Sequence, residues 1–267
     1  MKFYKYCGAG NDFVLLDWRD RAGAVNESDL PALARRLCDR HFGVGADGLM
    51  LVLPPERGGD CKMLFFNNDG STAEMCGNGA RCICKFCHDF GHAGDAPRIE
   101  TPAGLVTGAR VDEDRYRVRL NPPRNIRLNT SAAGLTCDYL ELGDPGIPHA
   151  VILTDLSQDR DALRQLARTV RYAPEFPRGA NVNLCALTGE NEVRLLTYER
   201  GVEDFTLACG TGNGATAAAL TLRGLIGGKG TRIVNDGGTL AVDITPGDPV
   251  GIDLTGDARL VFTGEIE

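Results

Sequence analysis

Residues 67–80 read Asn-Asn-Asp-Gly-Ser-Thr-Ala-Glu-Met-Cys-Gly-Asn-Gly-Ala, and a related pattern recurs in the second half of the chain. There, Tyr-Glu-Arg-Gly at 198–201 is followed by Ala-Cys-Gly-Thr-Gly at 208–212. In each copy, polar residues end an expected strand, and a Cys-Gly-x-Gly then opens an apolar or alanine-rich helix, expected over 81–90 and 213–223. Two copies of this sequence motif predict two similar domains that face each other.

The rest of the chain alternates short strands with a few helices. Two further helices are expected, one over 28–40 with Ser28 as its cap and one over 159–171. Strands are expected over 13–17, 49–53, 61–66, 116–120, 193–198 and 251–254. Regular βαβ alternation is missing, so the fold class is α+β rather than a doubly wound parallel sheet.

A domain break is expected at Asn121-Pro122-Pro123, because two successive prolines end a strand. The first domain would then span 1–121, joined by a C-terminal strand over 258–267. The second would span 122–257.

Composition narrows the class of protein. The 267 residues carry a net charge of -7, which disfavours a nucleic-acid binder. No apolar run reaches the length of a signal peptide or a membrane span, so we expect a cytoplasmic protein that does not bind membranes. The ten cysteines are then expected to be reduced thiols rather than a disulfide framework.

The Cys-Gly-x-Gly motif has a chemical rationale. The first turn of a helix leaves backbone N–H groups without intrahelical partners, and the helix dipole favours negative charge there. The N–H groups of Gly77, Asn78, Gly210 and Thr211 could therefore hold a substrate carboxylate. The same field would lower the pKa of a cysteine thiol at the helix start.

Two such cysteines suit the inversion of an amino-acid α-carbon. One thiolate removes the α-proton and the other thiol returns a proton to the opposite face, with the roles exchanged in the reverse direction. Without a pyridoxal cofactor, the carbanion needs other stabilisation, which the two helix N-termini would supply through its carboxylate. Cys76 and Cys209 are the candidates for this acid–base pair.

The chain resembles the diaminopimelate epimerase family along nearly its whole length. Seven blocks match in order: 8–13 (Gly-Ala-Gly-Asn-Asp-Phe), 39–48, 66–71 continuing into 74–82, 148–151 (Pro-His-Ala-Val), 178–182, 198–201 and 208–212. The resemblance implies two pseudo-symmetric domains, each a mixed β-sheet or barrel wrapped around a central helix, with the active site in the cleft between them. It also implies conversion of LL-diaminopimelate to the meso isomer in lysine and peptidoglycan precursor biosynthesis, without cofactor or metal, by a homodimer.

The resemblance assigns roles position by position. Cys76 and Cys209 match the catalytic cysteines, and His149 and Glu199 match residues that tune the thiols or relay protons. The side chains that hold the substrate match Asn11, Asn67, Asn181, Glu199 and Arg200, beside the N–H groups of Gly77, Asn78, Gly210 and Thr211.

Three positions depart from the family pattern. The usual Gly-Asn-Pro-His appears as Gly146-Ile147-Pro148-His149, so Ile147 replaces a substrate-binding asparagine. Gly48 stands where some relatives have glutamine, and Gly214 is an extra glycine in the second helix. A lost polar contact weakens preference for diaminopimelate, which keeps open a racemase of another amino acid or a non-catalytic amino-acid-binding module.

Other interpretations of the same residues rank lower. Cys84-Lys85-Phe86-Cys87-His88 spells a haem attachment motif, but we expect no export, and these residues fall inside the first helix. A zinc site would need a second cysteine pair. Taken alone, His149 would be a structural histidine and Glu199-Arg200 a surface ion pair.

Overall fold

The computed structural model describes residues 1–21, 26–73 and 76–266. Glu74 and Met75 of the first quoted stretch, and Glu267 at the end of the expected C-terminal strand, lie outside the described residues. The chain divides into unit 1, of residues 1–118 and 256–267, and unit 2, of residues 119–255. The domain boundaries predicted from the sequence lie after residues 121 and 257.

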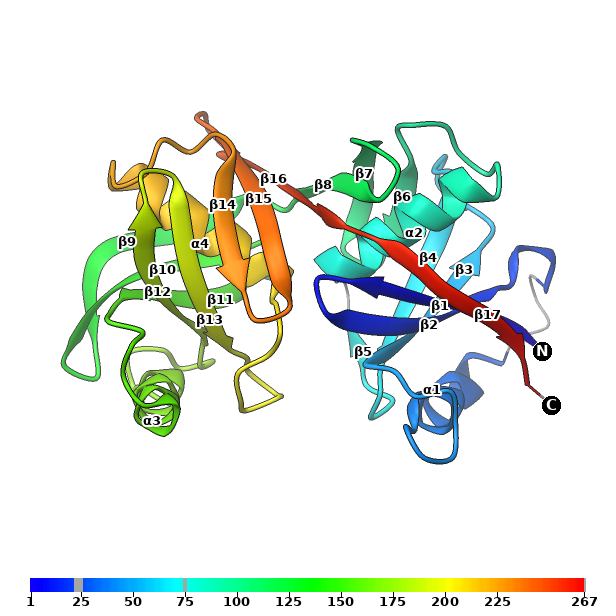
Figure 1. The fold of residues 1–267 in the computed structure, drawn as a ribbon, viewed down its shortest axis with the longest axis horizontal. Helices are drawn as coiled ribbons and strands as arrows, with labels where there is room; N and C mark the ends of the chain where they lie inside the picture. Colours follow the sequence, from blue (N-terminus) through cyan, green and yellow to red (C-terminus); the bar gives the residue numbers. More distant parts are fainter. Residues whose placement is uncertain (22–25, 74–75, 267) are drawn as a thin grey trace. The chain divides into compact units, whose positions relative to one another are not determined.

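Unit 1 is built on one mixed series of paired strands (Figure 1). The strands are β1 (Lys2–Gly8), β2 (Asn11–Asp17), β3 (Gly48–Leu53), β4 (Cys61–Asn67), β5 (Thr72–Ala73), β6 (Arg98–Thr101), β7 (Gly104–Arg110), β8 (Arg115–Leu120) and β17 (Arg259–Glu265). They pair in the order β17-β1-β2-β3-β4-β6-β7-β8, with β5 added to β4. The C-terminal strand therefore completes the sheet of the N-terminal half.

Unit 2 repeats this arrangement. Its strands are β9 (Pro123–Ala132), β10 (Leu135–Leu142), β11 (Ile147–Leu153), β12 (Asn181–Gly189), β13 (Glu192–Tyr198), β14 (Thr231–Asn235), β15 (Gly238–Thr245) and β16 (Gly251–Asp257). They pair in sequence order from β9 to β16. Among the strands that the structure describes, only the third and fifth pairings of each series are parallel: β2–β3 and β4–β6 in unit 1, and β11–β12 and β13–β14 in unit 2.

The described residues form four α-helices, which occupy matching places in the two units. The helices are α1 (Leu30–Cys38), α2 (Gly77–Asp89), α3 (Arg160–Arg171) and α4 (Gly210–Leu222). Helices α1 and α3 each connect the first parallel pair of strands, and α2 and α4 each connect the second. The predicted α+β fold of two similar units is confirmed by this equivalence of strands and helices.

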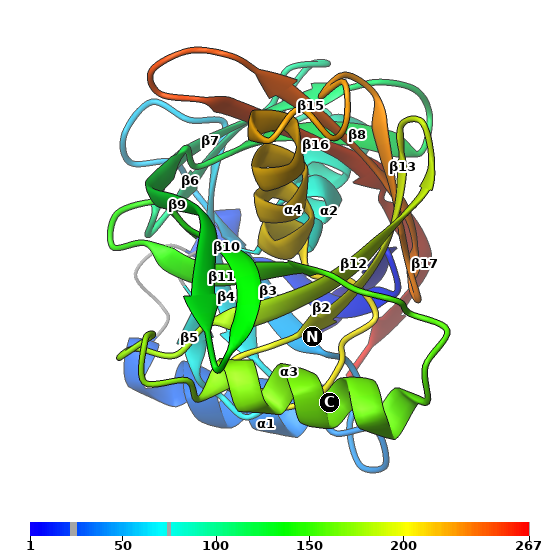
Figure 2. The same cartoon turned by 90° about the vertical axis from the view of Figure 1, so that its left-hand side faces the viewer.

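Each unit wraps its sheet around one central helix. In α2 the residues from Gly77 to Cys87 are all buried, and the helix contacts β1, β4, β6, β7 and β17. In α4 ten of thirteen residues are buried, and Figure 2 shows strands of unit 2 surrounding it. A helix that is buried on every side has no polar face, which explains the alanine-rich sequence of α4.

The other two helices cover the outer surface of the sheets. In α3 the buried residues Leu163, Ala167 and Val170 recur at four- and three-residue spacing, which places them on one stripe. That stripe packs on β11, β12 and β13 through a core that includes Val182 and Leu184. In unit 1, Ala34 and Leu37 of α1 pack in the same manner against Leu49 and Leu51 of β3.

The expected elements agree with the structure except at their limits. Each of the six expected strands lies within an observed strand, but the described residues form 17 strands in all. The central helices begin directly after Cys76 and Cys209, earlier than expected. Ser28 does not cap α1, because residues 27–29 form a 3-10 turn capped by Asn26, and the α-helix begins at Leu30.

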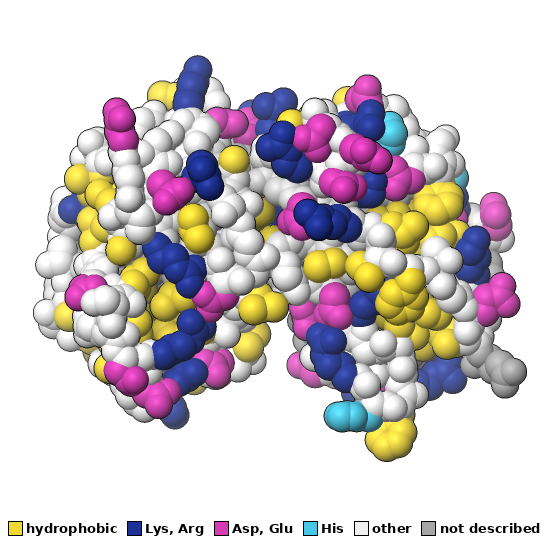
Figure 3. Space-filling model, viewed as in Figure 1, with side chains coloured by type: hydrophobic (Ala, Val, Ile, Leu, Met, Phe, Trp, Pro, Cys, Tyr) yellow, Lys and Arg dark blue, Asp and Glu magenta, His cyan; other side chains and the backbone are white. Residues whose placement is uncertain are grey.

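Strand β17 pairs with β1 and keeps several apolar side chains exposed. Val261 and Phe262 are 56% and 48% exposed, and Figure 3 shows hydrophobic side chains gathered over this strand.

No described helix is both long enough and apolar enough to cross a membrane.

Candidate active site

Each central helix begins at a cysteine that acts as its N-cap. Cys76 has backbone φ and ψ of -133° and 114°, and Cys209 has -111° and 112°. The backbone N–H of Gly79 donates to Sγ of Cys76 at 3.4 Å, and that of Gly212 donates to Sγ of Cys209 at 3.4 Å. Each sulfur thus takes the place of the oxygen that usually caps a helix, in the positive field of the helix N-terminus.

The glycine three residues after each cysteine lies against a strand side chain. A methyl group on Gly212 would lie 2.5 Å from Oδ1 of Asn183 and 2.9 Å from Oγ1 of Thr197. A methyl group on Gly79 would lie 3.0 Å from Sδ of Met50. The glycines therefore let both helix starts approach the sheets closely.

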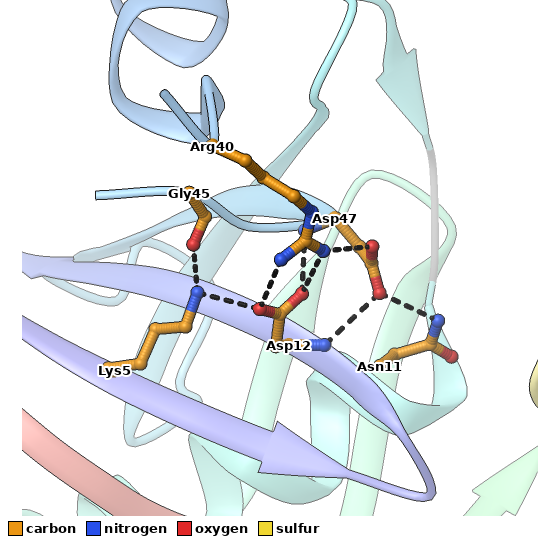
Figure 4. A network of polar contacts seen from close by, with 6 residues as sticks. All are labelled: Lys5, Asn11, Asp12, Arg40, Gly45 and Asp47. Atoms are coloured by element: carbon orange, nitrogen blue, oxygen red, sulfur yellow. Dashed lines mark hydrogen bonds and ion pairs between the residues drawn. The ribbon is translucent and has the colours of Figure 1, made fainter. Parts of the chain in front are cut away.

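In unit 1, the start of α2 is hydrogen-bonded to the start of β2. Nδ2 of Asn78 donates to Oδ1 of Asn11 at 2.6 Å. Nδ2 of Asn11 in turn donates to Oδ2 of Asp47 at 3.0 Å, as Figure 4 shows. Nη2 of the fully buried Arg81 donates to Oδ1 of Asn78 at 3.0 Å. Asn11, predicted to bind substrate through its side chain, is therefore hydrogen-bonded to the side chain of Asn78, whose backbone N–H was predicted to bind substrate.

Asp47 belongs to a larger charged cluster (Figure 4). Arg40 bridges Asp12 and Asp47 with Nη2 2.9 Å from an oxygen of each, and Nζ of Lys5 lies 2.8 Å from Asp12. Burial would raise the pKa of Asp12, but hydrogen bonds from Arg40 and Lys5 outweigh it and hold that pKa below its ordinary value.

Asn67 lies at the end of β4, in the turn that leads toward α2. Its Nδ2 donates to Oγ of Ser71 at 2.9 Å, and its backbone N–H donates to the carbonyl of Ser71 at 2.8 Å. The next N–H, that of Asn68, donates to the carbonyl of Asp47. The turn is therefore tied to the same residue that binds Asn11.

In unit 2, His149 is fully buried on β11 beside Asn181 of β12. Thr197 donates to Oδ1 of Asn183 at 3.0 Å, and Nδ2 of Asn183 points to Nδ1 of His149 at 3.2 Å and to the carbonyl of Ala150 at 3.3 Å. Because Nδ2 can only donate, Nδ1 of His149 accepts, and the ring hydrogen lies on Nε2. Nε2 has no hydrogen-bond partner among the described residues.

The protonation of His149 follows from this environment. Burial, and then the positive charge of Arg200, lower its pKa to about 3. The imidazole is therefore neutral near pH 7, and it can donate through Nε2 but does not carry a positive charge.

Glu199 lies beside the second cysteine. Its Oε1 accepts from Oγ1 of Thr206, and its carboxylate also accepts from the Cys209 side chain. Burial raises the pKa of Glu199, and the two hydrogen bonds act in the opposite direction. A carboxylate with a raised pKa next to a thiol can accept the thiol proton.

Arg200, Asn181 and Arg178 form a second polar group in unit 2. Oδ1 of Asn181 accepts from the N–H of Arg200 at 2.8 Å, and Nη1 of Arg200 donates to the carbonyl of Arg178 at 3.0 Å. Burial and the charges of Arg171 and Arg178 lower the pKa of Arg200. Several guanidinium groups close to one another suit the binding of a carboxylate.

The predicted site residues thus fall into two sets, one in each unit, and each set contains the cysteine and the glycine at the start of the central helix. Cys76, Gly77, Asn78, Asn11 and Asn67 belong to unit 1. The set in unit 2 comprises Cys209, Gly210, Thr211, His149, Asn181, Glu199 and Arg200. Oγ1 of Thr211 lies 3.4 Å from Sγ of Cys209.

The remaining cysteines of α2 pack in the core of unit 1. Cys82, Cys84 and Cys87 are fully buried, and Sγ of Cys87 lies 3.2 Å from Sγ of Cys61. Within the described residues, no group of three or more His, Cys, Asp or Glu side chains could hold a metal ion.

Several polar residues next to the site were not predicted from the sequence. Asn213 and Asn235 exchange amide hydrogen bonds of 3.0 and 2.9 Å, and Asn213 also donates to the carbonyl of Cys209. Asn183 was missed in the same way. The sequence signal was weak, because Asn213 lies between two glycines, a pattern that usually marks a turn, and Asn183 and Asn235 lie in strands without a recognisable motif.

Comparisons with known proteins show the family of the chain. The family model described as "Diaminopimelate epimerase" matches residues 3–126 and 143–261. A diaminopimelate epimerase of Aquifex aeolicus is 38% identical over 100% of this chain and 98% of its own length. One of Archaeoglobus fulgidus is 38% identical over 98% of this chain and 95% of its own length.

Solved structures show the same fold at lower identity. A predicted epimerase from Pseudomonas aeruginosa aligns with a TM-score of 0.71 at 14% identity, over 99% of this chain and 98% of its own. A probable proline racemase from Agrobacterium radiobacter aligns with a TM-score of 0.68 at 18% identity, over 100% and 92%. The match of the family model and the full-length relatives together show that the chain is an isomerase and belongs to the diaminopimelate epimerase family.

Proposed function

We propose that the chain interconverts LL-2,6-diaminopimelate and meso-diaminopimelate by a two-base mechanism, with Cys76 and Cys209 as base and acid. One observation carries the proposal. Both cysteines cap the N-terminus of the central helix of their unit, with similar backbone angles and the same 3.4 Å contact to a glycine N–H. Two equivalent sulfurs match the two proton positions that inversion of one carbon requires.

The proposed steps use groups that the chain itself provides. One cysteine thiolate removes the α-proton, and the other cysteine gives its thiol proton to the opposite face of the carbon. Backbone N–H groups of Gly77, Asn78, Gly210 and Thr211 hold the α-carboxylate and stabilise the charge that develops on it. Glu199 accepts the Cys209 proton when this cysteine has to act as base, a role that its hydrogen bond to Cys209 supports.

His149 has a different role in this mechanism. Its neutral ring, with hydrogen on Nε2, supports a function as a donor that tunes the site rather than as a charged proton carrier.

The far end of the substrate would contact polar side chains of both sets. Arg200 supplies a guanidinium for the distal carboxylate, and Glu199 supplies a carboxylate for the ammonium. Asn11, Asn67 and Asn181 supply amides that match either group. Ile147 at the start of β11 offers no such contact, which favours a racemase of another amino acid as the alternative function.

Exchange of the α-hydrogen in deuterium oxide tests the mechanism. We expect Cys76→Ser and Cys209→Ser each to lower turnover of diaminopimelate by about 10²–10⁴-fold or more. Cys7→Ser, which changes a partly buried cysteine of β1, serves as the matched control and should retain activity. Full activity of either active-site variant would exclude the two-thiol mechanism.

The same assay, run with a panel of amino acids, identifies the substrate. Faster exchange with another amino acid than with diaminopimelate would establish the alternative racemase. Thermal stabilisation by diaminopimelate without any exchange would instead indicate a binding module.

We also propose that the protein is cytoplasmic and forms a homodimer through β17. The exposed Val261 and Phe262 on a terminal strand support pairing with a second copy, because such edges are usually covered. Phe262→Asp should then produce a monomer in sedimentation analysis, and an unchanged mass would contradict this interface.

A further inference from the structure

Four side chains of unit 1 form a relay, a chain of three hydrogen bonds in which each side chain donates to the next. Arg81 donates to Oδ1 of Asn78, Asn78 donates through Nδ2 to Oδ1 of Asn11, and Asn11 donates through Nδ2 to Oδ2 of Asp47. The three donor–acceptor distances are 3.0, 2.6 and 3.0 Å. The relay therefore joins the first turn of α2 to β2 and to the residue before β3.

The chemistry of its two ends determines its direction. A guanidinium can only donate hydrogen bonds, and a carboxylate can only accept them. An asparagine amide can turn by half a revolution and exchange its oxygen and nitrogen. With Arg81 at one end and Asp47 at the other, only one orientation of Asn78 and Asn11 satisfies all three hydrogen bonds.

Arg81 and Asp47 are themselves held in place. Arg81 is fully buried, and its Nε and Nη1 also donate to the carbonyls of Asp257 and Gly77. Asp47 accepts from Arg40 and from the N–H of Asp12, and its own N–H donates to Asp12 (Figure 4). The carbonyl of Asp47 accepts from Asn68 in the turn that carries Asn67.

We propose that Asp47 and Arg81 are positioning residues that set the amide orientation of Asn11 for the substrate, Asp47 directly and Arg81 through the side chain of Asn78. The inference rests on the proposed substrate-binding role of Asn11. With one N–H of Asn11 bound to Asp47 and its oxygen bound to Asn78, the second N–H is the group presented to a ligand. A turned amide would present an acceptor in its place, which repels a carboxylate.

A double-mutant cycle tests this action through Asn11. Asp47→Asn removes the acceptor-only end at nearly constant volume, so a turned Asn11 amide loses only its hydrogen bond to Asn78 rather than the bonds to both Asn78 and Asp47. We expect KM for diaminopimelate to rise roughly ten-fold, with a much smaller change in kcat, as for the loss of one hydrogen bond to the substrate. In an Asn11→Ala background the same substitution should leave KM unchanged, because the amide that it orients is absent.

Asp17→Asn is the matched control. Asp17 lies at the other end of β2 and binds Arg19 through both carboxylate oxygens, much as Asp12 binds Arg40. Asp17 is not one of the four residues of the relay, so the substitution Asp17→Asn should leave KM for diaminopimelate unchanged. All variants are assayed below their thermal midpoints, and Arg81→Gln, which replaces the donor-only end by an amide, takes the place of Asp47→Asn in the cycle if the latter does not fold.

The outcomes separate the two hypotheses. If Asn11→Ala alone has no effect on KM, the proposed substrate contact of Asn11 is wrong. If Asn11→Ala raises KM but Asp47→Asn raises it equally in both backgrounds, Asn11 binds substrate and the positioning role of Asp47 is wrong.

Discussion

Glu199 and Cys209 share a hydrogen bond inside unit 2, and Thr206 binds the same carboxylate. At the scale of single residues, these contacts decide whether the carboxylate is ionised. Burial favours the neutral acid, whereas each donor favours the charged form. The balance between burial and donors therefore sets the pH at which Glu199 can accept a proton.

Thr206→Val should move this balance toward the neutral acid. The substitution keeps the shape but removes a donor, so the pKa of Glu199 should rise further. If turnover needs the ionised carboxylate, the acid limb of the kcat/KM profile should move to higher pH by about 0.7 unit, equivalent to about 1 kcal/mol.

Thr188→Val is the control for this pH profile. Thr188 donates to Glu192 at 3.1 Å in an exposed pair, so its removal should not move the profile. An unchanged acid limb in Thr206→Val would show that Glu199 does not control activity.

His149 supports a second prediction at the residue scale. Its pKa is about 3 in the folded chain and about 6.5 in an unfolded one, so below pH 6.5 only the unfolded state gains the proton. Protonation of His149 in the unfolded state therefore lowers the free energy of unfolding as pH falls from 6.5 toward 3.

His149→Gln should remove that pH dependence. Between pH 7.5 and 4.5, the wild-type free energy of unfolding should fall by about 2–3 kcal/mol more than that of the variant. Denaturant unfolding at the two pH values measures the difference, with the exposed His41→Gln as control. Equal losses in wild type and His149→Gln would show that His149 is protonated in the folded state.

At the scale of elements, the two helix starts are equivalent in geometry but differ in what surrounds them. Gly212 lies against Asn183, which is held by Thr197 and the carbonyl of Ala150. Gly79 lies against the flexible end of Met50. The cost of a methyl group at these positions should therefore differ.

Gly212→Ala should destabilise the protein by about 1–3 kcal/mol, because the methyl group would displace a hydrogen-bonded asparagine. Gly79→Ala should cost less, because the flexible end of the Met50 side chain can move away from the added methyl group. Thermal unfolding of the two variants compares them directly. A larger loss in Gly79→Ala would contradict this account of the helix starts.

The elements that the sequence predicted are those with local signals. The amphipathic α3 has its stripe and its cap, since Asp159 accepts from the N–H groups of Asp161 and Ala162. The two central helices follow a repeated cysteine–glycine motif. Both short and long strands were missed: β6 has only four residues, too few for a clear periodicity, and β9 has ten, most of them exposed, so apolar and polar side chains do not alternate along it.

At the scale of the whole molecule, one fold occurs twice, and the end of the chain returns to the first copy. Strand β17 pairs with β1 from Lys2–Glu265 to Cys7–Arg259, and the amino group of Met1 donates to Ile266. The stability of unit 1 therefore depends on a strand that follows unit 2 in the sequence.

Deletion of residues 259–267 should destabilise unit 1 selectively. Amide hydrogens of β1 and β2 should lose protection in hydrogen exchange, whereas those of β11 and β12 should keep it, because unit 2 has its own core. Removal of residues 266 and 267 alone provides the control. Uniform loss of protection in both units would show that they unfold as one cooperative block.

The sequence by itself determined the duplicated plan, the two cysteine-capped helices and the family. These follow from capping, glycine conformation and repetition, which act within a few residues of the chain. Only the tertiary structure decided which side chains meet at the helix starts. Asn11 and Asn78 are 67 positions apart, and His149 and Asn183 are 34 apart. Such contacts depend on strand register and on packing between elements, and no local pattern encodes them.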